Sequence, residues 1–499
     1  MPQDILKINL EKAEKRINET KEAVRQAKMR QYYHFMPQQG WLNDPNGLIY
    51  YQGKYHFFYQ YNPYDAFWGT MYWGHAVSRD LMHWEYLPVA LAPSESYDDH
   101  RQGGCFSGSS IEHDGKLYLF YTGTANHGNG FVQTQCMAYS EDGINFTKYE
   151  NNPVIEAPEG YEQANFRDPK VWKHENSFYL LCGAKKDGLA QALLYRSCDL
   201  RTWEYVNVLA ESRGELGYMW ECPDFYPMGD KYVLMFSPMG VHERTTVYLV
   251  GDMDYNTGKF HYHTTGEIDW GFDFYAPQSF LDHKGRRLIV GWANAWDWMP
   301  WWKDWGPSYK EGWCGSFNIP REVRLCKDNT LQFVPVEETE LLHEEEWRQE
   351  NIVIGREKYE VRAGNGIAFE MKMRINLRQS TAKSFVMLLR CSGDRETRVE
   401  FDLEKAQMSV DRSNADGWSR GKTKSPLFVS GNEILDIHLL ADQSSLEVFS
   451  NNYKTNHSCN VFADNAQNNN YLLAENGEIM IEEIITWGMK NAMSQAQSI

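Results

Sequence analysis

One short strand pattern recurs five times along the first two thirds of the chain. Each copy is a run of aromatic and aliphatic residues that follows a polar turn. The starts of successive copies lie 62, 61, 54 and 55 residues apart. A near-constant period of β-rich units is typical of radially repeated sheets, so the spacing predicts a five-bladed β-propeller. The copies are GKYHFFYQ (53–60), GKLYLFYTG (115–123), NSFYLLCGA (176–184), DKYVLMFSP (230–238) and GRRLIVGWA (285–293).

A second element follows three of these copies and stays in phase with them. Unrelated hairpins of a β-sandwich are the alternative interpretation, but they would not keep both elements in register. The second element reads AVSRDLMHW (76–84), AYSEDGINF (138–146) and YRSCDLRTW (195–203).

The repeat gives three acidic residues equivalent positions. Taken alone, Asp44 in the turn sequence NDPNG would indicate only a loop. Equivalent positions of a propeller lie around one axis, so acids that share a position are predicted to converge at one end of the central channel. The repeated strands align on Tyr55, Leu117, Phe178, Tyr232 and Arg287. Ten to eleven residues before these positions, the five units carry, in order, Asp44, Phe106-Ser107, Asp168, Glu221 and Ala276-Pro277.

Charge and cysteine content exclude several classes of function. The 499 residues hold 68 Asp and Glu against 50 Lys and Arg, and the net charge of −18 disfavours a nucleic-acid partner. The nine cysteines are scattered singly without a CxxC pair, so no metal site or disulfide framework is predicted. The first residues, MPQDILKINLEKAEKRINE, lack the apolar core of a signal peptide, and no apolar run could span a membrane. A cytoplasmic location is therefore expected.

Changes in pattern divide the chain into four segments. Residues 1–31 are predicted as a helical extension with a thin apolar stripe. Packing of this stripe across the main domain is favoured, and binding of a partner is the alternative. Residues 32–335 are assigned to the propeller. A Pro- and Glu-containing connector covers 327–350, and its residues 336–350 are assigned to a linker. Residues 351–499 return to alternating strand patterns and predict a β-sandwich. A structural or oligomerising role, including contacts in a homo-oligomer, is expected for this domain, with carbohydrate binding as the alternative.

Three converging acids without His or Cys ligands argue against a metal centre. The sequence also lacks HExxH, GxSxG and a phosphate-binding glycine loop. Two carboxylates across a sugar bond are the usual equipment for glycoside hydrolysis. Glu221 lies between Trp220 and Cys222, the less polar neighbours, and is the predicted proton donor. Asp44 lies among turn amides and Asn43, whose hydrogen bonds favour the ionised form, and is the predicted nucleophile.

At these motifs the sequence resembles glycoside hydrolase family 32, the invertases, β-fructofuranosidases and fructan exo-hydrolases. The resemblance runs through both predicted domains, from about residue 32 to about residue 487. It implies a five-bladed propeller with a β-sandwich, and retaining release of terminal β-fructofuranosyl units through a fructosyl-enzyme. It rests on WLNDPNG (41–47), FYQYNP (58–63), YWGHAVSRDLMHW (72–84), FSGS (106–109), FRDPK (166–170), WECPD (220–224), FYAPQ (274–278) and ADQSSLEVF (441–449).

The resemblance also implies roles for individual residues. Asp44 would be the nucleophile and Glu221 the acid/base. Asp168, with Arg167 beside it, would hold the fructose hydroxyls and stabilise the transition state. For the aromatic residues, packing within a blade is the alternative. The remaining substrate contacts carried over are Asn43 and Gln60 as hydrogen-bonding residues, Trp41, Trp68 and Phe106 as pocket walls, Ser107 and Tyr275 as substrate contacts, and Trp292 and Trp313 at the pocket rim.

The segment 292–315 is unusually rich in Trp and matches the family only at its ends. It follows the fifth repeated strand, so it could overhang the pocket mouth and stack on a sugar beyond the fructose. A hydrophobic lid or a dimer contact is an equal alternative.

The expected substrates are sucrose, sucrose 6-phosphate and short fructo-oligosaccharides, and no cofactor is expected. A fructosyltransferase would use the same covalent intermediate with a sugar as the acceptor. Inverting arabinanase-like propellers do not explain WLNDPNG together with WECPD. From another class of function, a non-catalytic fructan-binding protein could share the fold, and the loss of one acid would be its mark.

Overall fold

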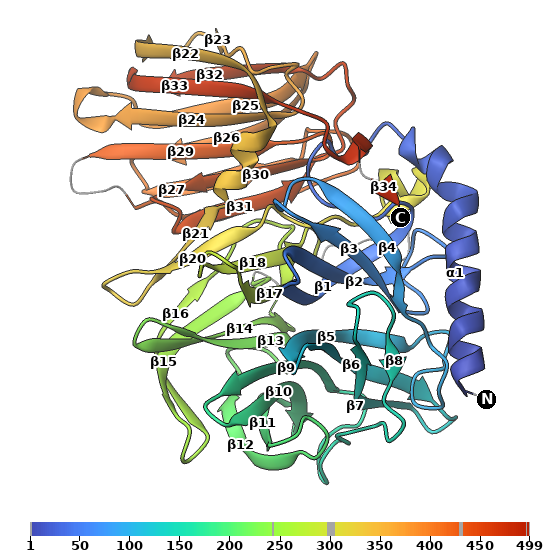
Figure 1. The fold of residues 1–499 in the computed structure, drawn as a ribbon. Coiled ribbons are helices and arrows are strands. Elements are labelled where there is room, and N and C mark those ends of the chain that lie inside the picture. The colour runs from blue at the N-terminus through green and yellow to red at the C-terminus, as the bar shows by residue number, and fades with distance from the viewer. Residues whose placement is uncertain (1, 242–243, 297–304, 429–432, 496, 499) are drawn as a thin grey trace.

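The chain folds into two β-rich bodies with one long helix along the side of the first (Figure 1). The computed structural model describes residues 2–241, 244–296, 305–428, 433–495 and 497–498. Five sheets form the first body and two six-stranded sheets form the second. The predicted all-β fold, a propeller followed by a sandwich with an N-terminal helix, is confirmed.

The first body is a closed ring of sheets. Each sheet has four antiparallel strands in chain order, and the first strands of successive sheets contact one another until β17 contacts β1. The first sheet gains β19 (Trp313–Cys314) and β34 (Gln497–Ser498), both parallel to their neighbours. The five sheets are β1 (Gly40–Tyr51), β2 (Lys54–Asn62), β3 (Tyr72–Ser78) and β4 (Trp84–Leu91); β5 (Gly104–His113), β6 (Lys116–Asn126), β7 (Phe131–Ser140) and β8 (Thr147–Lys148); β9 (Phe166–His174), β10 (Ser177–Lys186), β11 (Leu189–Ser197) and β12 (Glu204–Glu211); β13 (Met219–Met228), β14 (Lys231–Met239), β15 (Val247–Asp254) and β16 (Lys259–Glu267); and β17 (Tyr275–Leu281), β18 (Arg287–Trp292), β20 (Arg321–Leu325) and β21 (Leu331–Pro335).

The repeated strand of the sequence is the second strand of each sheet, and it is apolar on both faces. In β10, Leu180 packs in the core shared with the second sheet, while Leu181 packs in the core shared with the fourth. In β14, Leu234 and Met235 divide in the same way between the third and fifth sheets. Neighbouring residues of a strand point to opposite faces, so a sheet covered on both sides needs a continuous apolar run.

The second body is a β-sandwich whose two sheets enclose a separate apolar core. Short 3-10 helices lie between strands at η1 (Pro307–Glu311), η2 (Glu337–Leu342), η3 (Leu377–Gln379) and η4 (Met493–Gln495). One sheet comprises β22 (His343–Ile354), β33 (Ile479–Met489), β24 (Phe369–Asn376), β29 (Ile434–Ala441), β30 (Ser445–Ser450) and β31 (Thr455–Asn460). The other comprises β23 (Tyr359–Glu360), β32 (Asn469–Glu475), β25 (Ser384–Ser392), β26 (Arg395–Asp402), β27 (Gln407–Asp411) and β28 (Lys422–Pro426).

Most of the segment predicted as a linker, residues 336–350, has regular structure. It contains η2 and the first part of β22, which pairs with β33 across Gln349 and Ile484. The alternating apolar pattern of a strand is missing there because outward side chains of β22, such as Glu344 and Glu345, are charged and solvated. Much of the segment interpreted as a linker is therefore an edge strand of the sandwich.

The N-terminal helix α1 (Pro2–Arg25) packs against the first sheet, at β4. Its buried stripe includes Ala13, Ile17 and Val24, and these residues belong to the core between the fifth and first sheets. Two polar contacts fix the register: Val89 N–H donates to Glu14 Oε1 at 2.7 Å, and Asn9 Nδ2 donates to a main-chain carbonyl at 2.8 Å. No described helix has the length and apolar character needed to cross a membrane.

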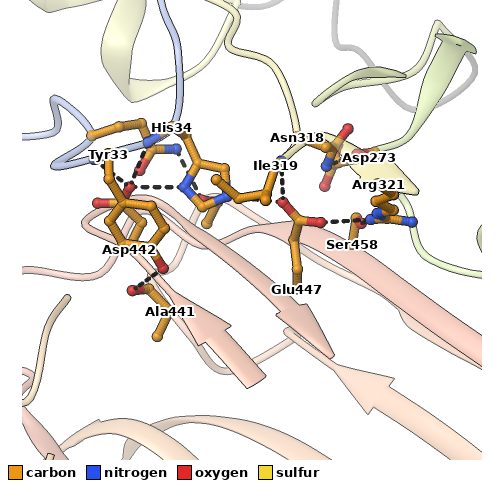
Figure 2. Close-up of polar contacts among 12 residues, drawn as sticks. Tyr33, His34, Asp273, Asn318, Ile319, Arg321, Ala441, Asp442, Glu447 and Ser458 are labelled. Carbon is orange, nitrogen blue, oxygen red and sulfur yellow. Dashed lines mark hydrogen bonds and ion pairs between the residues drawn. The ribbon is translucent and has the colours of Figure 1, made fainter. Parts of the chain in front are cut away.

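A buried ion network joins the N-terminal segment, the propeller and the sandwich (Figure 2). His34 Nδ1 lies 2.8 Å from Asp442 Oδ2, and His34 Nε2 lies 2.8 Å from Glu447 Oε1. Arg321 donates to Glu447 Oε2 at 2.6 Å and to Asp269 Oδ2 at 2.8 Å. Each of these side chains is at most 2 % exposed. Opposite charges alternate along the network, which offsets the cost of burying them.

Candidate active site

A break in strand register recurs at the same place in all five innermost strands. Two unpaired residues face one residue of the second strand there, or one faces none in β5, so each innermost strand carries one extra residue. A β-bulge of this kind bends the strand and re-aims the bulged side chains, and bulges gather beside active sites. The bulged residues are Asn43-Asp44 in β1, Ser107 in β5, Asp168-Pro169 in β9, Cys222-Pro223 in β13 and Ala276-Pro277 in β17.

The three predicted acids lie close together beside these bulges. Cys222 is the link, because its N–H donates to Asp168 Oδ2 at 2.8 Å and its Sγ lies 3.6 Å from Asp44 Oδ2. Arg167 is a second link, with Nη2 3.0 Å from Glu221 Oε1 and Nε 3.9 Å from Asp168 Oδ2. A single group of charges is therefore built from β1, β9 and β13.

Asp44 is partly buried, and its two carboxylate oxygens have different surroundings. Ser107 donates from Oγ to Asp44 Oδ2 at 2.5 Å, while Oδ1 has no hydrogen-bond partner among the described residues. Burial and the charge of Glu221 raise the pKa of Asp44 to about 6. Hydrogen bonds from Ser107 and Asn43 lower the pKa, as the sequence suggested, but they do not outweigh burial.

Glu221 has polar partners on both oxygens. Arg167 donates to Oε1 from Nε at 3.2 Å and from Nη2 at 3.0 Å, and the Tyr275 hydroxyl donates to Oε2 at 2.5 Å. The expectation of less polar surroundings was wrong. Trp220 and Cys222 flank Glu221 in the sequence, but neighbours in a strand point to the opposite face, so its environment comes from β9 and β17.

Asp168 is buried in a strained stretch of backbone. Its φ of 65° lies in the left-handed region, and Thr122 Oγ1 accepts a hydrogen bond from its N–H at 2.9 Å. Burial raises the pKa of Asp168 to about 7, against the lowering influence of Arg167. Such a conformation costs on the order of 1–3 kcal/mol, and it persists where surrounding contacts hold it, as they do here.

The predicted hydrogen-bonding and wall residues lie around the acids with different exposures. Trp68 and Phe106 are partly exposed and meet edge to face at a ring distance of 6.1 Å. Gln60 is buried and donates to the carbonyl of Cys105, next to Phe106. Trp41 is fully buried, and its Nε1 donates to Asn43 Oδ1 at 2.8 Å. Trp41 therefore holds Asn43 in place and has no exposed face.

The two Trp residues predicted at the pocket rim are buried. Trp292 is fully buried and packs edge to face against Trp41 and Tyr275 at 5.7 and 6.4 Å. Trp313 contacts Arg30, whose guanidinium lies 5.7 Å from its ring centre. This differs from the expected rim position, because the residues around 313 pair with β1. Of the Trp-rich segment 292–315, residues 297–304 lie outside the described part of the chain.

Two residues of the site were missed by sequence reasoning. Cys222 bridges Asp168 and Asp44, and Thr122 accepts from the backbone of Asp168. For Cys222 the signal was its place beside Glu221 in WECPD. For Thr122 there was no signal, since it lies on the second strand of another sheet.

Comparison with known proteins accounts for nearly the whole chain. The model for the glycosyl hydrolases family 32 N-terminal domain matches residues 34–335, and the model for the family 32 C-terminal domain matches residues 338–488. The chain belongs to glycosyl hydrolase family 32. It is therefore a glycosidase.

Relatives of this family 32 chain cover it almost end to end. It is 34% identical to a sucrose-6-phosphate hydrolase of Zymomonas mobilis, over 92% of each chain. It is 35% identical to a sucrose-6-phosphate hydrolase of Escherichia coli, over 91% of this chain and 94% of that one. Among solved structures, a Bombyx mori family 32 β-fructofuranosidase superposes with a TM-score of 0.81 at 31% identity, covering 97% and 98% of the two chains. A Lactobacillus gasseri sucrose-6-phosphate hydrolase does so with a TM-score of 0.84 at 26% identity, covering 96% of each.

Proposed function

We propose that the protein is a retaining β-fructofuranosidase that releases fructose from sucrose and sucrose 6-phosphate. The observation that carries this proposal is the grouping of Asp44, Asp168 and Glu221 on three innermost strands, with Asp44 and Glu221 in different hydrogen-bonding environments. The similar proteins of Zymomonas mobilis and Escherichia coli are sucrose-6-phosphate hydrolases, which supports sucrose 6-phosphate as a substrate. A Bombyx mori family 32 enzyme has been solved in complex with sucrose, which supports sucrose.

In the first step, Asp44 attacks the anomeric carbon C2 of the fructosyl unit. Ser107 donates to its Oδ2 at 2.5 Å and holds the carboxylate in position for this attack. A C2–O bond to Asp44 forms as the glycosidic C2–O bond breaks, and Glu221 gives its proton to the leaving oxygen. The products of this step are a fructosyl-enzyme ester, an ionised Glu221 and free glucose or glucose 6-phosphate.

In the second step, Glu221 acts as a base. It takes a proton from water, the water oxygen bonds to C2, and the ester bond to Asp44 breaks. Two inversions at C2 release fructose with the β configuration. Asp168, held by Cys222 and Thr122, accepts hydrogen bonds from fructose hydroxyls and offsets positive charge at the transition state.

The remaining contacts are proposed from position. Trp68 and Phe106 offer partly exposed rings to the sugar faces, and Asn43 and Gln60 are close enough to the acids to bind hydroxyls. Sugar contacts by the buried Trp41, Trp292 and Trp313 stay predictions. We also propose that the protein acts in the cytoplasm on imported sugar. A homo-oligomer formed through the β-sandwich is a further proposal, and both rest on the sequence alone.

The test is initial fructose release by the purified protein from sucrose, sucrose 6-phosphate, 1-kestose and inulin. We expect release from the first two, with β-fructofuranose as the first anomer seen by NMR. The α anomer first would overturn the retaining mechanism. Growth of kestose-type products instead of free fructose would assign a fructosyltransferase, and no reaction by folded protein would assign a binding protein.

A further inference from the structure

The segment that leads into β17 is held against a strand of the sandwich. Trp270 N–H donates to the carbonyl of Asn456 at 2.8 Å, and Asp273 N–H donates to the carbonyl of Ser458 at 3.1 Å. These two acceptors belong to β31 of the sandwich. Between them, Gly271 lies so close that an added Cβ would be 2.1 Å from the Ser458 carbonyl oxygen. The backbone of residues 270–273 is thus laid directly against a sandwich strand.

Asp273 anchors this segment with a fully buried carboxylate. Its Oδ2 accepts from Arg412 Nη1 at 2.7 Å and from Asn460 N–H at 2.6 Å. Both donors belong to the second body. On the propeller side, Asn318 Nδ2 donates to the Asp273 carbonyl at 3.1 Å, and Figure 2 shows Asp273 beside Asn318 and Arg321. Asp273 is therefore clamped from both domains.

Two residues further along the chain, Tyr275 reaches the centre of the site. Its hydroxyl donates to Glu221 Oε2 at 2.5 Å. Burial and the charge of Glu221 keep the pKa of Tyr275 well above its usual value, so the hydroxyl remains a donor. The path from the sandwich to the acid/base is short: Arg412, Asp273, one intervening residue, Tyr275 and Glu221.

We propose that Asp273 and Arg412 are positioning residues that hold the Tyr275 hydroxyl against Glu221. On this view the sandwich completes the acid/base group from outside the propeller. The proposal rests on the role of Glu221 in the proposed function. A hydrogen bond of 2.5 Å weakens steeply when its donor moves, so loss of the clamp impairs proton transfer to the leaving group. Attack by Asp44, whose carboxylate is held by Ser107 and Cys222, is unaffected.

The variant that tests this carries Asp273→Asn and Arg412→Met together. Removing both charges avoids leaving one buried and unpaired. We expect kcat/KM on sucrose, whose glucose unit is a poor leaving group, to fall by about 10- to 100-fold. On an aryl β-fructofuranoside, whose leaving group needs no proton, we expect less than about a 3-fold loss. The single variant Asp273→Asn, which is nearly isosteric, should show the same selectivity at smaller size if the pair folds poorly.

Glu370→Gln is the matched control. Glu370 is also a buried carboxylate of the sandwich, and its ion pairs within the described chain are with His343, His438 and Lys372. Its replacement should change the rates on both substrates equally or not at all. Equal losses on the two substrates for the Asp273 variants would overturn the proposal, because general loosening of the fold would then explain them.

A double-mutant cycle gives an independent test. Tyr275→Phe alone should show the same selective loss on sucrose. If the clamp acts through Tyr275, adding Asp273→Asn and Arg412→Met to Tyr275→Phe should cost less than about a further 2-fold. Fully additive losses would overturn the proposal. Failure of the wild-type protein to release fructose would instead overturn the proposed function, so the two failures are distinguishable.

Discussion

Protonation of Asp44 should determine how the rate of the proposed reaction falls at low pH. The attacking carboxylate must be ionised, and its pKa of about 6 predicts that kcat/KM on sucrose falls as the pH drops through about 6. Ser107 donates to this carboxylate and stabilises the charge. Ser107→Ala should therefore move the acid limb upward by about 0.5–1 pH unit in a rate profile. Ser110→Ala on the same strand, where the hydroxyl binds only a carbonyl, is the control and should leave the limb in place.

Replacing Asp44 should abolish activity and raise the stability of the folded protein at high pH. Asp44→Asn removes the nucleophile, so turnover of sucrose should fall by more than about 1,000-fold. The folded-state pKa of about 6 lies above the ordinary value of 3.8, so the folded protein loses stability as pH rises from about 4 through about 6. The variant escapes that loss, and its Tm at pH 8 should exceed that of the wild type.

Asp187→Asn, at an exposed position, should change neither activity nor Tm and serves as the control. An Asp44→Asn protein that still turned over sucrose would remove Asp44 from the mechanism. One that was less stable than the wild type at pH 8 would contradict the burial argument.

Glu221→Gln should reveal its role through the leaving group. The change removes the proton donor, so sucrose hydrolysis should fall by about 100-fold or more, while an aryl β-fructofuranoside should still form the fructosyl-enzyme. The measurement is a pre-steady-state burst of aryl alcohol. Equal losses on both substrates, with no burst, would argue against Glu221 as the proton donor.

At the residue scale, the sequence located the acids but not their surroundings. Asp44, Asp168 and Glu221 could be predicted because each occupies the same place in a repeat, and a repeat implies an axis. The hydrogen bond from Tyr275 to Glu221 could not be predicted, because it joins two blades and leaves no local pattern. The raised pKa of Asp44 also depends on burial by other blades, whereas the sequence displays only its neighbouring amides.

At the element scale, the helix α1 offers a matched test of packing. Ile17 is 6 % exposed and packs in the core between the fifth and first sheets, whereas Ile8 on the same helix is 47 % exposed. Ile17→Ala should lower the free energy of unfolding by about 2 kcal/mol. Ile8→Ala should change it by less than about 0.5 kcal/mol. Urea unfolding of the two variants makes the comparison, and similar effects would mean that α1 does not unfold with the propeller.

Strands were easier to predict from the sequence than their boundaries. The second strand of each blade is apolar on both faces, so it produces a continuous signal such as YLLCGA in β10. The strand β22 produces none, because its side chains from Glu344 to Glu346 are charged and exposed. An edge strand of a sandwich is defined by its partner, here β33, which lies more than a hundred residues away.

For the whole molecule, the buried network around His34 predicts a pH dependence of stability. Burial alone would lower the pKa of His34, but its hydrogen bonds to Asp442 and Glu447 outweigh burial and raise the pKa to about 9. The unfolded value is 6.5, so this stabilisation is fully present below pH 6.5 and is lost as pH rises through about 9. The amount at stake is about 3 kcal/mol.

The measurement is Tm between pH 6 and pH 10 for the wild type and for His34→Gln. We expect the wild-type Tm to fall over this range and the variant to start lower and vary less. Parallel curves for the two proteins would contradict a protonated His34. The network itself was invisible in the sequence, since its members come from residues 34, 269, 321, 442 and 447 and none of them has a local signature.

The short strand β19 determines when the first sheet can be completed during synthesis of the chain. Trp313 and Cys314 pair with Gly40 and Trp41 at the start of β1, so the first sheet is completed by residues from the far end of the ring. A ribosome adds roughly 5–20 residues per second, and the gap between these segments therefore lasts on the order of 15–55 s. Until then the emerging chain presents an unpaired strand edge immediately before Asp44. During synthesis, the edge of β1 in the first blade therefore stays unpaired until β19 has left the ribosome.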